Sequence, residues 1–324
     1  MAYNNQLSRA DIAPLIPEDV ADTFLTDLTD TSVAMTRFRQ VPVAQGQTRF
    51  PVMSALPIAY WVAGDTGLKQ TTELAWGNKY LNVEELAAIA PIPEMVLDDL
   101  ADAGIGGGID VWEEIRPTVV AELARVLDQA VFFGVNAPSS FPSNILAACQ
   151  AVLPTANTHT EGAAVASGGI QDDIDQCIGM LEPQGYDFDG IVAARTLRGK
   201  LRRARTTYGE RLEGLNPDLT EYLGEPLSYP MRGLWPTATG GVSPEAFVGQ
   251  WDQFVVGVRK DITIKILDQA VIQDNTGAIV YNLAQQDMVA ARFTLRVGWQ
   301  VANTIRFDQP DPTKRYPVAA LMLA

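Results

Sequence analysis

The most constraining feature of the sequence is a regular alternation of apolar and polar side chains in RFTLRVGWQVAN, residues 292–303. Phe293, Leu295, Val297, Trp299 and Val301 take every second position. Side chains of a β-strand point alternately to its two faces, so this period predicts a strand with one buried and one solvent-exposed face. At about 3.3 Å per residue, the ten alternating residues 292–301 span roughly 33 Å.

A helix of similar length is predicted over residues 110–133. Its apolar residues recur every three or four positions, which gives one apolar stripe along a helix: Trp112, Ile115, Val119, Leu123, Val126, Ala130 and Phe133. A continuous helix of this length spans about 36 Å at 1.5 Å per residue. Pro117 predicts a kink, or a restart of the helix. The matching lengths predict that this helix packs on the strand at 292–303.

The rest of the chain mixes short helices and strands without a regular β-α-β repeat, which predicts an α+β fold. An amphipathic helix follows SGG at 167–169, DFDGIVAA at 187–194 contains a short buried strand, and TLRGKLRRAR at 196–205 is a basic helix. Residues 246–272 are mostly β, with Gly257 as a possible site of a bulge or bend.

Two segments near the N-terminus lack the apolar residues to fold independently. Residues 1–44 contain three prolines and a short predicted helix at 17–28, and they are interpreted as an arm that lies on something else. TRFPVM at 48–53 and IAYWVAG at 58–64 predict strands of an edge or a free hairpin, because Pro51 and Pro57 lack an N–H. Tyr60, Trp61, Trp76 and Tyr80 flank the polar tip of that hairpin. These aromatic residues would cover either their own core or a neighbouring chain.

Composition argues against most catalytic and binding classes. The 324 residues carry a formal charge of −15, which disfavours general nucleic-acid binding. The single histidine, His159, lies in the polar stretch NTHTEG and is interpreted as a solvated loop residue. Cys149 and Cys177 are predicted to be free buried thiols, which favours folding in the cytoplasm. No apolar run reaches the ~18 residues of a membrane span.

Three local motifs favour structural interpretations over chemical ones. GIGGG at 104–108 lacks the pattern of a phosphate loop and is predicted to connect two helices. Asp172, Asp173 and Asp175 are predicted to begin a helix rather than to bind a metal. The run RTLRGKLRRARTTYGER, which includes Arg198, Arg202 and Arg203, favours contact with an acidic surface of an adjacent copy over nucleic-acid binding. No catalytic residues, cofactor site or metal site are predicted.

The order of these features resembles the major capsid proteins of tailed bacteriophages with the Hong Kong 97-type fold. The resemblance covers nearly the whole chain: an arm, an extended hairpin, a long helix, the helix-strand-helix segment from SGGIQDD onward, and an Arg-x-Gly-aromatic run before the final strand YPVAALML. It implies an N-terminal arm at 1–44, an extended hairpin loop at 45–80, a peripheral domain at 81–140 and 255–303 containing the spine helix, and an axial domain at 141–254 and 304–324.

The resemblance also implies a function and partners. The chain would be a non-enzymatic shell protein that assembles in the cytoplasm of a bacterial host into hexamers and pentamers of an icosahedral or prolate head. That head would enclose double-stranded DNA without sequence-specific binding. A separate scaffolding protein, a portal and a decoration protein are the expected partners. Contacts between subunits would involve Tyr60, Trp61, Lys69 and Trp76 of the hairpin, with Arg198, Arg202 and Arg203 of the basic helix.

Two other readings stay open on the residues alone. An encapsulin-type nanocompartment has the same fold and would hold cargo enzymes. A soluble α+β enzyme working through carboxylates would form a small closed oligomer rather than particles.

Overall fold

The computed structural model describes residues 32–59, 61–62, 69, 71–72, 74–95, 111–205, 218–230, 233–235, 243–274 and 276–323. Four predicted features lie outside these residues: the helix at 17–28, the GIGGG connector, Tyr60 and most of the hairpin tip. The described part combines helices with separate, mixed β-sheets, so the predicted α+β class is confirmed.

The alternating segment forms the long strand β13 (Met288–Val301) of a four-stranded sheet. β13 starts four residues earlier than predicted because Met288 to Ala291 pair with the end of β4 (Glu84–Pro93). It ends before Asn303, whose φ of 40° lies in the left-handed region. The sheet order is β1 (Arg39–Pro42), β10 (Phe254–Leu267), β13 and β4, and β10 and β13 run antiparallel.

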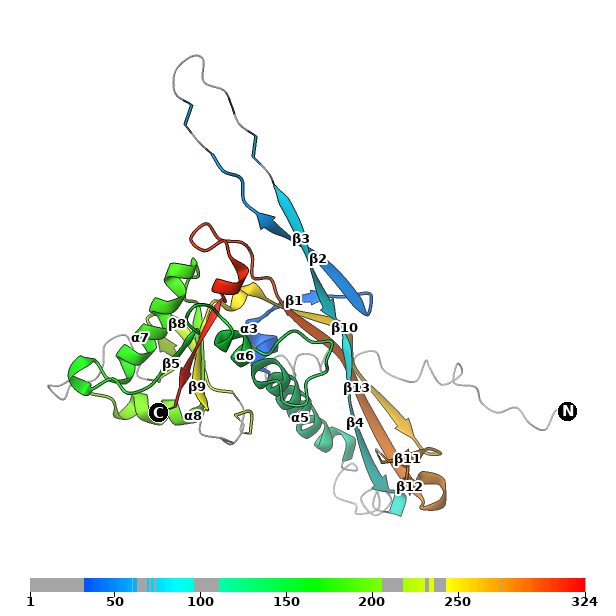
Figure 1. The fold of residues 1–324 in the computed structure, drawn as a ribbon. Coiled ribbons are helices and arrows are strands. Elements are labelled where there is room, and N and C mark those ends of the chain that lie inside the picture. The colour runs from blue at the N-terminus through cyan, green and yellow to red at the C-terminus, as the bar shows by residue number, and fades with distance from the viewer. Residues whose placement is uncertain are drawn as a thin grey trace.

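The predicted long helix is α5 (Val111–Phe133), and it lies along this sheet (Figure 1). It stays one helix through Pro117, so the predicted restart is wrong. The apolar residues of β13 and of α5 share one core, so the predicted packing is confirmed. The predicted stripe of α5 is wrong in its register, because among its described members only Leu123 is a buried part of that core, with Val119 and Phe133 partly buried against it. The members that these two elements contribute to this core are Val120, Leu123, Ala124, Leu127, Val131, Phe132, Ala291, Phe293, Leu295, Val297, Trp299 and Val301.

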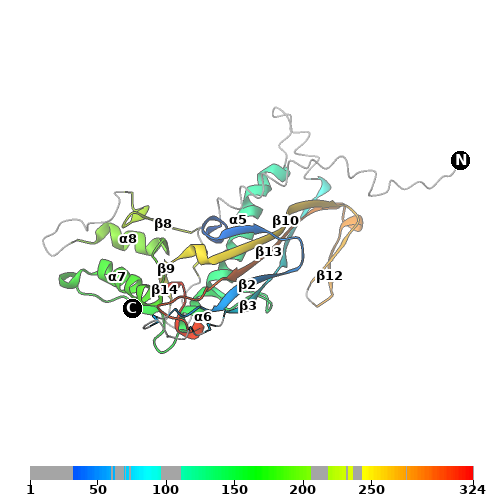
Figure 2. The same cartoon turned by 90° about the horizontal axis from the view of Figure 1, so that it is seen from above.

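A six-stranded sheet forms the second part of the molecule, beside α7 (Ile170–Leu181) and α8 (Arg195–Arg203) (Figures 1 and 2). Its order is β5 (Thr158–Thr160), β14 (Val318–Met322), β9 (Pro244–Gly249), β6 (Gly190–Ala193), β8 (Glu225–Ser228) and β7 (Glu221–Tyr222). Every residue of β14 is buried because the two faces serve different cores. Val318, Ala320 and Met322 join the core of α5, whereas Ala319 and Leu321 join the core beneath α7 and α8.

The end of the predicted arm is part of this chain's own core. α3 (Val33–Arg37) buries Val33, Ala34 and Met35, and β1 pairs in parallel with β10. Phe38 stacks on Phe254 with ring centroids 4.8 Å apart. Residues 32–43 therefore lie on their own chain, and only 1–31 of the predicted arm fall outside the described residues.

Two sequence expectations about β-structure are corrected. β2 (Gln47–Ala55) contains the TRFPVM strand, but the described residues of IAYWVAG are not in a strand. Pro57, which cannot donate a ladder hydrogen bond, precedes that segment. The bulge expected at Gly257 lies elsewhere, because the register with β13 is continuous through Gly257 and shifts after Val258 and again after Lys260.

Candidate interaction surfaces

A two-stranded hairpin extends away from the body of the molecule (Figure 1). It consists of β2 and β3 (Ala75–Asn82), which form a sheet of their own in which Met53 lies opposite Trp76. Trp76 is 66% exposed and Trp61 is fully exposed. Tyr80 and Lys69 are exposed as well. An isolated two-stranded hairpin is at best marginally stable in water, so these aromatic side chains form an apolar surface in need of a partner.

The base of the hairpin is held by a close approach of its backbone to the large sheet. Gly257 of β10 lies directly opposite Gly298 of β13, and the side chain of Leu81 packs against this glycine pair and is fully buried. A Cβ on Gly298 would lie 2.0 Å from the carbonyl oxygen of Asn82. Gln300 reinforces the junction, because its Nε2 donates to the carbonyl oxygen of Tyr80 at 2.7 Å. The direction in which the hairpin leaves the body is therefore set by packing.

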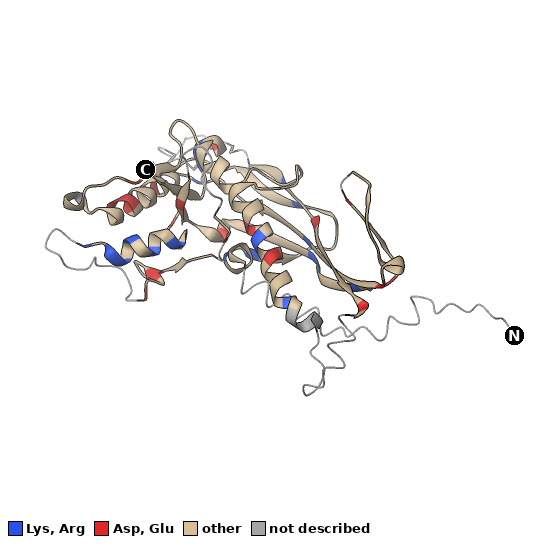
Figure 3. Cartoon of the chain, turned by 90° about the horizontal axis from the view of Figure 1, so that it is seen from below, with Lys and Arg blue, Asp and Glu red and all other residues tan. Residues whose placement is uncertain are grey.

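The helix α8 is rich in basic residues along its length (Figure 3), and its arginines are exposed. Arg202 and Arg203 are exposed, and the guanidinium of Arg198 lies 5.3 Å from the ring centroid of Tyr229. The buried side of the helix consists of Leu197 and Leu201. Three of the predicted contact residues thus share one exposed helix on a part of the molecule remote from the hairpin (Figure 1).

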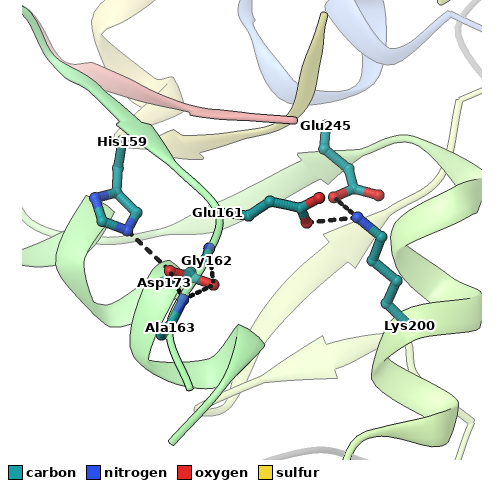
Figure 4. Close-up of polar contacts among 7 residues, drawn as sticks. All are labelled: His159, Glu161, Gly162, Ala163, Asp173, Lys200 and Glu245. Atoms are coloured by element: carbon teal, nitrogen blue, oxygen red, sulfur yellow. Dashed lines mark hydrogen bonds and ion pairs between the residues drawn. The ribbon is translucent and has the colours of Figure 1, made fainter. Parts of the chain in front are cut away.

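Lys200 is an exception among the basic residues of α8, because it bonds within its own chain (Figure 4). Its Nζ lies 2.5 Å from Glu161 and 2.7 Å from Glu245. Burial lowers the pKa of Lys200, but the hydrogen bonds to the two carboxylates outweigh it and raise the pKa overall. Burial raises the pKa of Glu245, which is 1% exposed, and the Lys200 ammonium opposes that shift. Lys200 therefore anchors α8 to β9 and is not a free contact residue.

His159 is a structural residue of β5, so its interpretation as a solvated loop histidine is wrong. Its Nε2 lies 2.9 Å from Oδ1 of Asp173, and its side chain is only 27% exposed (Figure 4). Asp173 also accepts hydrogen bonds from the backbone N–H groups of Gly162 and Ala163. The predicted helix-start role of Asp173 holds, because it lies in the first turn of α7, but its carboxylate also fixes the loop after β5.

A buried carboxylate that the sequence pattern does not indicate holds the end of the arm. Asp128 of α5 accepts hydrogen bonds from the Ser32 hydroxyl at 2.6 Å and from the N–H groups of Val33 and Ala34 at 2.9 and 3.1 Å. Burial raises the pKa of Asp128 to about 6, against the opposing effect of these hydrogen bonds. Asp128 lies outside the apolar stripe predicted for this helix, so the sequence pattern carries no signal for this bond. Asp128 therefore fixes Ser32 and the first turn of α3 on the body of the molecule.

The described residues also bear on metal binding, on membrane spanning and on the state of the two thiols. Among them, no three His, Cys, Asp or Glu side chains are grouped to hold a metal ion. Within the same residues, no helix has both the length and the apolar character required to cross a bilayer. Cys149 and Cys177 are free and buried, as predicted, and burial raises the pKa of each thiol.

Comparison with known proteins identifies the family. The model of the phage capsid family matches residues 13–307. The chain belongs to the phage capsid family. It is 22% identical over 294 residues to the major capsid protein of Staphylococcus phage 80alpha, which covers 90% of this chain and 83% of that relative. The encapsulin and enzyme readings receive no support from these comparisons.

Solved structures agree with this capsid family assignment. A chain from Microbacterium phage Oxtober96 is 30% identical with a TM-score of 0.75, and the match covers 99% of this chain and 100% of that one. A chain from Mycobacterium phage Adephagia is 27% identical with a TM-score of 0.76, covering 99% of both. The capsid of a native GTA particle shares the fold at 15% identity, with a TM-score of 0.64 and full coverage of both chains.

Proposed function

We propose that the chain is the major capsid protein of a tailed phage. It assembles into hexamers and pentamers of an icosahedral or prolate head that encloses double-stranded DNA without reading its sequence. The family assignment supports a shell protein, and the exposed aromatic hairpin is the observation that carries the assembly mechanism. The head is the protein's location in the virion, and the bacterial cytoplasm is its site of assembly.

The proposed domains are those that the resemblance to capsid proteins implies, and the core of α5 contains residues of both, such as Phe293 and Val318. The peripheral domain comprises residues 81–140 and 255–303, and the axial domain comprises 141–254 and 304–324. The arm at 1–44 and the hairpin loop at 45–80 contact neighbouring subunits, except for residues 32–43, which pack on their own chain. A closed shell repeats each contact many times, so individually modest interfaces are enough to hold it together.

Burial of the hairpin aromatics supplies a substantial part of the contact energy in this proposal. A tryptophan buries up to about 250 Å². Trp76 is 66% exposed, so roughly 160 Å² remains to be covered, which corresponds to at most about 4 kcal/mol at ~25 cal/mol per Å². Trp61, with its side chain fully exposed, adds a comparable amount. The monomer gains none of this energy by itself.

The α8 arginines form a second proposed contact. Arg198, Arg202 and Arg203 face solvent on a chain with a formal charge of −15, so an acidic surface of an adjacent subunit complements them. A separate scaffolding protein, a portal and a decoration protein complete the proposed set of partners.

Particle formation by hairpin variants tests the assembly mechanism. The purified wild-type chain, with a scaffold if needed, should give closed shells or ring-shaped capsomers by light scattering and negative-stain microscopy. Trp76→Ser, or a shortened tip at residues 63–70, should leave the circular dichroism of the subunit unchanged but abolish particles. Trp76→Tyr is the matched control and should retain most of the assembly, because a tyrosine ring buries most of the same area. Normal particles from the Trp76→Ser chain would contradict the proposed role of the hairpin.

A further inference from the structure

The face of the large sheet that points away from α5 carries an unusual arrangement of basic side chains. Lys260 of β10 lies directly opposite Arg296 of β13, and Lys265 lies directly opposite Arg292. The opposed residues between them, Thr263 and Thr294, share a hydrogen bond of 2.7 Å. These positions alternate with the buried residues of β13, so all of them belong to the outward side of the sheet. Lys260, Lys265, Arg292 and Arg296 are called the basic face below.

This arrangement is unfavourable in the isolated subunit. Like charges directly opposite each other on neighbouring strands destabilise a sheet. Within the described part of the chain, only Arg296 of these four has an ion-pair partner, Glu85 of β4 at 2.7 Å. Two like-charge pairs on either side of one threonine pair, in a chain with a formal charge of −15, therefore indicate a surface that is completed by an anionic partner.

The chain itself contains a segment with the required charge. Residues 1–31 hold six acidic side chains, at positions 11, 18, 19, 22, 27 and 30, and one basic side chain, Arg9, so their side chains sum to −5. The hairpin loop, residues 45–80, is the other extended segment, and it has Arg49, Lys69 and Lys79 against Asp65 and Glu73, a sum of +1. Charge complementarity thus selects the N-terminal segment over the hairpin.

We propose that residues 1–31 of one subunit dock on the basic face of a second subunit. This inference rests on the proposed shell assembly. Ser32 is bound to Asp128 on the α5 side of the sheet, whereas the basic face is on the opposite side, which favours a neighbouring copy over the segment's own chain. Thirty-one residues reach up to about 100 Å when extended, enough to span to a neighbour.

Apolar positions on the same side of the sheet suit a mixed acidic and apolar segment. Ile89 of β4 lies opposite Arg292 and is 45% exposed, and Ala87 lies opposite Thr294. Apolar residues such as Leu15, Val20 and Phe24 are interspersed among the carboxylates of the N-terminal segment. The partner can therefore contribute both charge neutralisation and apolar burial.

Zero-length crosslinking of assembled particles tests this docking. A carbodiimide couples carboxylates to lysines in direct contact, so Lys260 and Lys265 report on the basic face. Particles assembled from an equal mixture of ¹⁴N- and ¹⁵N-labelled full-length chains are crosslinked at low salt and analysed by mass spectrometry. We expect crosslinks between carboxylates of residues 1–31 and Lys260 or Lys265, with mixed-isotope pairs present. These crosslinks should weaken at 1 M salt, where the Debye length falls to about 3 Å.

Charge-conserving and charge-reversing variants provide a second test of the docking. Lys260→Arg/Lys265→Arg keeps the charge and should assemble normally without these crosslinks. Lys260→Glu/Lys265→Glu should lower the particle yield at least tenfold, and Glu18→Lys/Asp19→Lys/Asp22→Lys in the same chain should restore part of it. Wild-type particles that lack the crosslinks, or that show only same-isotope pairs, would overturn the docking while leaving shell assembly intact. Protection of Lys260 and Lys265 from acylation by added double-stranded DNA, with no crosslinks to residues 1–31, would overturn it in favour of phosphate binding.

Discussion

Replacing Gly298 with alanine tests whether a backbone contact fixes the root of the hairpin. The added Cβ would lie 2.0 Å from the Asn82 carbonyl oxygen and 2.8 Å from the Asn82 carbonyl carbon. Contacts of this kind ordinarily begin near 3.4 Å, so the backbone of β3 has to move by more than 1 Å. A backbone carbonyl cannot rotate away as a flexible side chain could, and the cost falls on the junction between the hairpin and the sheet.

The magnitude follows from the contacts at that junction. Overpacking a well-packed site typically costs 1–3 kcal/mol, or roughly 2 kcal/mol here. Moving β3 also loosens Leu81, whose full burial is worth about 2 kcal/mol, and stretches the hydrogen bond from Gln300 to Tyr80. We expect Gly298→Ala to lower the free energy of unfolding of the subunit by about 3–4 kcal/mol, and to reduce assembly because the hairpin leaves the body in a different direction.

Urea unfolding of the unassembled subunit, followed by far-ultraviolet circular dichroism, measures the effect. Gly77→Ala is the matched control, because Gly77 lies on the same hairpin and an added Cβ there would meet only ordinary contacts at 3.7 Å. That variant should differ from wild type by less than about 0.5 kcal/mol. A Gly298→Ala subunit as stable as the Gly77→Ala subunit, with normal particles, would refute the close-approach reasoning.

Two further predictions concern buried carboxylates. Burial raises the pKa of Asp128 from 3.8 to about 6, so its protonated form is favoured in the folded state. The stability it contributes is complete below about pH 4 and is lost as the pH rises through about 6, a change of about 3 kcal/mol. Urea unfolding across this pH range should show the free energy of unfolding of wild type falling by that amount relative to the Asp128→Asn variant. Plots of unfolding free energy against pH that run parallel for the two proteins would contradict the prediction. Lys200→Met leaves Glu245 buried without its cation, which should cost about 3 kcal/mol in urea unfolding. Lys200→Met/Glu245→Met should recover most of the loss, and no recovery would rule out the ion pair as its cause.

Exposure and bonding separate the proposed assembly surfaces from the anchors within the subunit. Trp61 and Trp76 have no partner in the described part of the chain that would bury their rings, and Arg202 and Arg203 face solvent. Lys200 and Asp128, by contrast, are committed to bonds within the subunit. Substitutions of the exposed tryptophans and arginines should therefore change particle formation. Substitutions of Lys200 and Asp128 should instead change the stability of the subunit.

The sequence by itself determined the elements whose signal is local and repeated. The period of two in β13 and the recurrence at three and four residues in α5 both follow from the geometry of a single element, so they can be read without knowing what lies nearby. The presence of a single histidine and the basic density of α8 are likewise visible in the residues alone. Pro51 and the flanking aromatics also indicated the hairpin before any partner was known.

Only the tertiary structure decided which distant residues meet. Ser32 and Asp128 are 96 positions apart, and the contact of Leu81 with Gly257 and Gly298 brings three strands together. His159 seemed solvated by its polar neighbours in sequence, yet the fold places Asp173 against it. Burial, ion pairing and close backbone approach depend on distances in space between segments remote in the chain, and no local pattern encodes those distances.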